Sequence, residues 1–173
     1  SDGAGPGLDA LSIGSIVVSD SSLLWDDRQS GSSMELTAFN LSTGSVSLAE
    51  PVDLTMSFGL DLDKKQSMQL ELATTLEIAS GFSAIAASDL DLDIQLSGPE
   101  LPGGSIEMKG GVESLNLNLD DGELSVKGLL AQALGASLEA QLTGTAVTSD
   151  SPRIKGTIKV PAMNLREVLA KTG

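Results

Sequence analysis

The stretch VDLTMSFGLDL, residues 52–62, alternates apolar residues with polar or small ones without a break. Successive side chains of a β-strand point to opposite faces of the sheet, so this stretch predicts a strand with one apolar and one polar face. The same alternation returns from Met68 to Ile78 and from Leu90 to Leu96. So much one-sided sheet must cover its apolar face with a second layer of the protein, a partner or lipid.

Turn-forming residues divide the chain into short alternating runs, which predict an antiparallel meander of about ten strands. Asp121-Gly122 predicts a two-residue hairpin turn. The apolar positions change parity between Leu36 and Leu41, and a bulge or short connection around residues 40–44 would explain the change. The predicted strands are 16–18, 23–25, 34–39, 52–62, 67–79, 83–97, 105–112, 114–120, 123–130, 137–147 and 153–160.

Ten strands exceed the usual handful per sheet, so the sheet must curl, split into two layers or close. We therefore predict an all-β fold: a curled, strongly twisted antiparallel sheet, or a two-layer structure or incomplete barrel. Residues 1–7 indicate an N-terminal linker or the edge of an excised piece, and residues 8–173 a single β domain. That domain ends in a predicted short helix over 164–171, with Asn164 as cap and Glu167 as the reciprocal acid.

The charge and composition exclude several classes of partner. With 24 acidic against 10 basic residues, the net charge of −14 disfavours nucleic acid and direct adhesion to an anionic membrane surface. Aromatic residues make up only 2%, which disfavours a carbohydrate-binding module built on aromatic platforms. No apolar run approaches the ~20 residues of a membrane-spanning helix, so no transmembrane segment is expected within this chain. Because the chain begins at Ser1, we expect a processed protein or a piece of a longer one.

No catalytic arrangement emerges from the sequence, and we expect no enzyme and no cofactor. The chain has no histidine to serve as a base for its many serines, and it lacks both the Ser-x-x-Lys and the Gly-x-Ser-x-Gly motifs. Asp26 and Asp27 are neighbours in a predicted loop and face apart, unlike the spaced carboxyls of glycosidases.

A metal site is not expected either. Asp89, Asp91 and Asp93 line one face of a predicted strand, where adjacent members lie about 6.6 Å apart. Calcium needs oxygens that converge from a curved loop, so these carboxylates indicate a solvated strand face.

The apolar face is the remaining candidate site. Its residues could line a lipid groove, although each could equally belong to an ordinary sheet core. The residues that we predict to face lipid are Met56, Phe58, Met68, Leu70, Leu92, Ile94, Leu117 and Leu142.

Three segments resemble the AsmA family of bacterial envelope proteins. They are IVVSDSSLLWDD (16–27), LTAFNLSTG (36–44) followed by PVDL (51–54), and AMNLREVL (162–169). In the last of these, Met163 stands where the family usually has an aromatic residue. The resemblance implies a periplasmic segment of a Gram-negative envelope protein, whose parent chain is anchored in the inner membrane.

The same resemblance implies a role in outer-membrane assembly or in phospholipid transport between membranes. The expected partners are then phospholipid acyl chains and flanking segments of the parent chain. The family offers no catalytic residues to carry over. The alternative is a structural or protein-interaction module that binds no lipid, in which the sheet edges or the apolar face dock neighbouring segments.

Overall fold

The structure is a computed structural model that describes residues 12–27, 29, 31–63 and 65–161. The predicted linker at residues 1–7 and the predicted helix at 164–171 both lie outside the described residues. The only helical turns within the described part are the short 3-10 turns η2 (Ser80–Phe82) and η3 (Pro102–Gly104).

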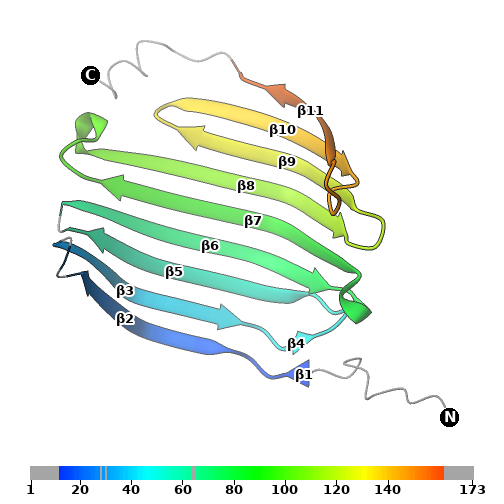
Figure 1. Cartoon of the computed structure of the whole chain (residues 1–173), viewed down its shortest axis with the longest axis horizontal. Helices are drawn as coiled ribbons and strands as arrows, with labels where there is room; N and C mark the ends of the chain where they lie inside the picture. The colour runs from blue at the N-terminus through cyan, green and yellow to red at the C-terminus, as the bar shows by residue number, and fades with distance from the viewer. Residues whose placement is uncertain (1–11, 28, 30, 64, 162–173) are drawn as a thin grey trace.

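One sheet of nine strands makes up most of the described chain (Figure 1). Each strand pairs antiparallel with its neighbour in the order β11-β10-β9-β8-β7-β6-β5-β3-β2, and this confirms the predicted antiparallel meander. Two short strands, β1 (Ser12–Ile13) and β4 (Val46–Ser47), pair separately. The strands of the large sheet are β2 (Val17–Asp27), β3 (Ser32–Thr43), β5 (Val52–Leu62), β6 (Gln66–Ile78), β7 (Ala84–Ser97), β8 (Ser105–Asn118), β9 (Glu123–Ala133), β10 (Ala136–Thr145) and β11 (Arg153–Lys159).

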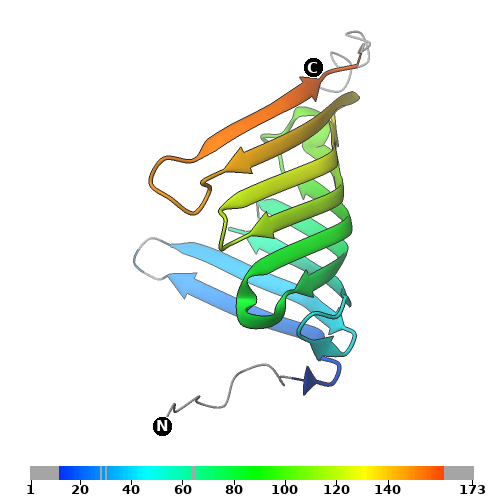
Figure 2. The ribbon, with the colours of Figure 1, turned by 90° about the vertical axis from the view of Figure 1, so that its right-hand side faces the viewer.

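The sheet is a single curled layer and remains open. Its first and last strands, β2 and β11, are at opposite ends of the strand order and do not pair with each other. Figure 2 shows the strands arched to one side, with β2 and β11 sloping in opposite directions as the twist of a large sheet requires. The curled sheet is therefore the correct alternative among those that the sequence left open, and the two-layer structure is wrong.

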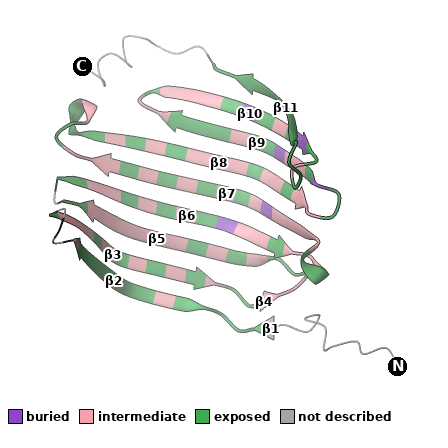
Figure 3. Ribbon diagram, viewed as in Figure 1, coloured by how far each residue is buried: buried purple, intermediate pink, exposed green. Residues whose placement is uncertain are grey.

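Very little of the described chain is fully buried. Exposed and half-buried residues alternate along most strands, as Figure 3 shows. The only buried apolar residues in the described part are Ala87, Val126 and Ala140, and the only buried polar one is Thr74. The side chains of the apolar face are mostly half-buried although no second layer within the described residues covers them, because neighbouring side chains of that face cover one another.

Bulges set the curvature, and the first of them corrects a prediction. The register between β3 and β5 shifts between Thr37 and Asn40, at Ala38, whose φ is 49°. The extra residue moves the apolar set of β3 from even to odd positions. The change of parity seen in the sequence is therefore a bulge at Ala38, and the predicted position within residues 40–44 is wrong.

Two more bulges, in β7 and β9, keep the apolar residues of these strands on one face of the sheet. β7 carries an extra residue opposite Thr74, next to Asp89 with a φ of 50°, and the Thr74 hydroxyl donates to the Ser88 carbonyl at 3.1 Å. β9 carries one beside Gly128, whose φ is 61°. Each bulge returns the following apolar residues to the same face after a local bend of the strand.

Three predicted boundaries are wrong for local reasons. Residues 17–18 and 23–25 belong to the single strand β2, and residues 105–112 and 114–118 belong to the single strand β8. The predicted Asp121-Gly122 hairpin turn spans four residues, because Asn118 pairs with Glu123. The Asn118 carboxamide oxygen accepts bonds from the backbone N–H groups of residues 120 and 121, both at 3.0 Å, and this stabilises the longer turn.

The bulge in β9 gives a test of the curvature. A Cβ at Gly128 would lie 2.6 Å from the Glu113 Cβ, whereas a Cβ at Gly31, which also has a positive φ of 73°, would meet nothing within 4 Å. We expect Gly31→Ala to cost about 1–2 kcal/mol from the left-handed backbone alone. Gly128→Ala should cost clearly more, because it adds the steric conflict between β9 and β8. Urea unfolding of both variants measures the difference, and equal losses would contradict a tightly packed bulge.

Candidate functional site: the apolar face

All eight residues predicted to face lipid lie on the same face of the sheet. They pair across the strands with one another or with further apolar residues of that face; Phe58, for example, pairs with Leu70, which pairs with Ile94. The Phe58 ring also contacts that of Phe39, with ring centroids 6.5 Å apart. One row of paired residues crosses seven neighbouring strands of the large sheet, from β3 to β10: Leu41, Met56, Leu72, Leu92, Gly110, Ala131 and Leu138.

A hollow of about 480 Å³ lies on this face at the β7–β10 side. Its apolar lining runs from large side chains on β7 to small ones on β9 and β10. Where a leucine would fill the space, the chain has a glycine or an alanine, and the missing side-chain volume leaves the hollow. The apolar lining residues are Leu92, Ile94, Met108, Gly110, Ala131, Ala133, Ala136, Leu138 and Val160.

Only Leu92 and Ile94 of the eight predicted residues line this hollow. Sequence reasoning missed the small residues because it looked for large apolar side chains as ligand contacts. The sequence contained a signal for the hollow, because Gly110, Ala131 and Ala133 occupy positions that alternate with polar residues and belong to the apolar face. Small residues at core positions of neighbouring strands indicate space on that face.

The apolar face continues to both edges of the sheet. On β2, Leu23 and Trp25 are 60% and 54% exposed, and they pair with Leu36 and Met34 of the apolar face. On β11, Ile154 and Ile158 are both 62% exposed. Exposed apolar surface of this extent is uncommon unless something binds it.

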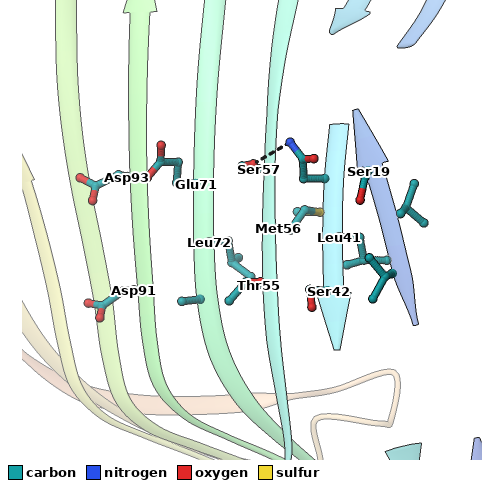
Figure 4. A pocket seen from close by; sticks show the side chains of 14 residues that line it. Ser19, Leu41, Ser42, Thr55, Met56, Ser57, Glu71, Leu72, Asp91 and Asp93 are labelled. Carbon is teal, nitrogen blue, oxygen red and sulfur yellow. Dashed lines mark hydrogen bonds between the residues drawn. The ribbon is translucent and has the colours of Figure 1, made fainter. Parts of the chain in front are cut away.

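The opposite face is polar and acidic, with a shallow hollow of about 510 Å³ across β2–β7. Figure 4 shows the Glu71, Asp91 and Asp93 carboxylates spread over neighbouring strands beside the hydroxyls of Thr55 and Ser57. The Asn40 amide donates to the Ser57 hydroxyl at 3.5 Å. Every lining carboxylate is exposed, so this hollow is a solvated outer surface.

The three aspartates of β7 do not act as one cluster. Asp89 lies at the bulge, whereas Asp93 forms an ion pair with Lys109 at 3.1 Å. Among the described residues, no three histidine, cysteine, aspartate or glutamate side chains are placed to hold a metal ion. Asp26 and Asp27 are adjacent positions of β2, opposite Ser33 and Ser32, and adjacent strand positions point to opposite faces.

Comparisons with known proteins find no match to this chain among protein-family models, curated proteins or solved structures. The resemblance to the AsmA family therefore stays a prediction. No helix within the described residues is both long and apolar enough to cross a membrane.

The ion pair on the polar face gives a pH test. The Asp93 carboxylate accepts a hydrogen bond from Lys109, and together with its negative charge this raises the pKa of Lys109 above its ordinary 10.5. Because the folded pKa is the higher one, the pair stabilises the fold below pH 10.5, and its contribution is lost as pH rises through the folded pKa.

We expect Asp93→Asn to lower the pKa of Lys109 toward 10.5. Asp91→Asn, two positions along the same strand, removes an equal charge without touching the ion pair and should change the pKa less. NMR titration of the lysine side chains measures both effects. Equal shifts in the two variants would mean that the general field of the acidic face, and not the ion pair, sets the pKa.

Proposed function

We propose that this chain is a non-enzymatic periplasmic segment of an AsmA-like protein that carries phospholipid acyl chains along the apolar face of its sheet. The observation that carries the proposal is the continuous apolar face, which no second layer covers within the described residues. A hollow lined by small residues of β8–β10 lies on that face and offers space for a chain of methylene groups.

The proposed mechanism is passive. Burying a methylene group yields about 0.8 kcal/mol relative to water, so an acyl chain is held on the apolar face and does not escape into solvent. A bilayer offers the acyl chain a similar apolar environment, so exchange between bilayer and protein is close to neutral in free energy. This balance suits transfer between membranes, because the chain can both enter and leave the groove.

The polar face of the sheet supports the proposal that lipid binds on the opposite, apolar face. Its carboxylates keep the outside of the sheet hydrated, and the net charge of −14 repels an anionic membrane surface. The apolar face is then the side of the sheet that meets lipid. The head group would remain in water at the border of this face.

The location of the protein rests on the resemblance alone. It supports a periplasmic segment whose parent chain is anchored in the inner membrane, with flanking segments as neighbours and outer-membrane assembly as the process served. The alternative of an interaction module without lipid is favoured by one observation, the exposed apolar residues at both sheet edges, such as Trp25 and Ile158.

Bound lipid is the direct test. We expect the protein purified from a Gram-negative host without detergent to carry phospholipid, which native mass spectrometry detects as discrete mass increments. After delipidation, the protein should take phospholipid up again from vesicles. A delipidated, folded protein that takes up none would overturn the proposal and leave the interaction module.

Filling the hollow should reduce lipid uptake. Ala131 lines the hollow, so the ring of Ala131→Phe would occupy space that an acyl chain needs. The expected result is a several-fold loss of lipid per protein, measured by mass spectrometry after incubation with vesicles. Gln95→Phe is the matched control, because Gln95 follows the hollow residue Ile94 on β7 but lies on the polar face, paired with Gln69. Equal losses in both variants would count against this hollow as the site.

A further inference from the structure

The described part of the chain ends beside the hollow of the apolar face. β11 pairs with β10 as far as Lys159, which stands opposite Glu139. One residue further along the chain, Val160 lines the hollow and is 57% exposed. Pro161 has no N–H group to donate to β10, so a regular ladder does not continue through it. The residues that follow therefore start from the border of the hollow.

The sequence after Pro161 carries apolar residues at helical spacing. Leu165, Val168 and Leu169 occupy positions i, i+3 and i+4 of the helix predicted over 164–171, and such positions share one side of a helix. A helix of this length measures about 12 Å. Isolated helices shorter than about 12–15 residues are marginal in water, so the predicted helix needs an apolar surface to pack against.

The distances allow this segment to reach the whole hollow. Leu165 is five residues beyond Val160, which corresponds to at most about 17 Å of extended chain. The hollow crosses from β10 to β7, and three strand spacings amount to about 14 Å. An apolar helix side that follows Pro161 can therefore meet the residues of β9 and β8 as well as those of β10.

The covalent link and the shape of the hollow favour this occupant. A segment joined through a short link has an effective concentration in the millimolar range, whereas a lipid or a second copy must come from solution. The lining near Val160 includes the small residues Ala131, Ala133 and Ala136, which leave room for larger side chains. Leucine and valine side chains in that room would be removed from water, which is favourable.

We propose that residues 164–171 of this chain pack Leu165, Val168 and Leu169 into the hollow between β7 and β10 and so cover it. The segment then competes with any other ligand of the hollow. For acyl chains this competition rests on the proposed function, whereas the docking of the segment does not.

Paramagnetic NMR on the full chain tests the docking. The chain has no cysteine, so a spin label attached at Lys171→Cys marks one position only. We expect the label to broaden the amide signals of the hollow residues Ala131, Ala133 and Leu138 and to leave those of β2 and β3 sharp.

Two variants of the labelled protein separate docking from mere attachment. Leu165→Asp should reduce the broadening several-fold, because it would place a carboxylate in an apolar hollow. Asn164→Asp is the matched control: it adds the same charge, keeps a good helix cap and should preserve the broadening. Equal broadening in the two variants would overturn the proposal, since the covalent link alone would then explain the proximity.

A mixed sample distinguishes the chain's own segment from that of a second copy. Spin-labelled protein without isotopes is mixed with isotope-labelled protein that carries no spin label. We expect sharp signals throughout. Broadening at the hollow in this mixture would assign the hollow to the segment of a second copy and contradict docking within one chain.

Lipid uptake distinguishes a failure of this inference from a failure of the proposed function. With phosphatidylcholine vesicles, Leu165→Asp should take up several-fold more lipid than Asn164→Asp, as measured by native mass spectrometry. If neither variant takes up lipid while their broadening differs as expected, lipid carriage is refuted and the docking stands. If both take up lipid equally and show equal broadening, the docking is refuted and lipid carriage stands.

Discussion

The structure depends on one constraint: in the described part of the chain, a sheet with an apolar face has no second layer to bury it against. Most domains solve this problem by packing two layers around a core. Within the described residues, the leucines, isoleucines and methionines can be covered only by their neighbours on the same face. The buried residues with side chains, Ala87, Val126, Ala140 and Thr74, all belong to the apolar face. Contact between neighbouring side chains of one face takes the place of a two-layer core, and it leaves these side chains half exposed.

The bulges make that curvature compatible with the sequence. A strand that bends by inserting one residue would turn its following apolar side chains outward if the pattern did not change with it. In β3 and β7 the apolar positions change parity at Ala38 and Asp89, so the sequence and the backbone shift together. The result is a sheet whose acidic side chains lie mostly on one face and whose apolar ones lie mostly on the other. Such a division suits a protein that must stay in water while it holds something apolar.

The fold was largely predictable because alternation is a local signal that each strand carries by itself. Strand 52–62 has the predicted boundaries, and the antiparallel order follows from the short turns between strands. The bulge at Ala38 was misplaced because the change of parity spans Leu36 to Leu41, and an alanine side chain does not mark which residue of that span has the positive φ. The hollow was missed because it arises from the small side-chain volume at Gly110 and Ala131. Only the pairing of β8 with β9 brings these small residues together. Whether the sheet would split or curl depends on side chains from distant strands, and no single run of sequence contains that information.

The strictly sequential order of the sheet has a consequence for how the molecule can change. Each strand of the large sheet makes nearly all its contacts with the strands next to it in the order, in the manner of a repeat protein, so stability is close to a sum of neighbouring interfaces. Opening then begins at the outermost hairpins and moves inward, and the central strands exchange their amide hydrogens last. Hairpins could also be gained or lost at either end without rebuilding the middle. The width of such a sheet is thus free to vary over evolution, in steps of two strands, while its cross-section stays the same.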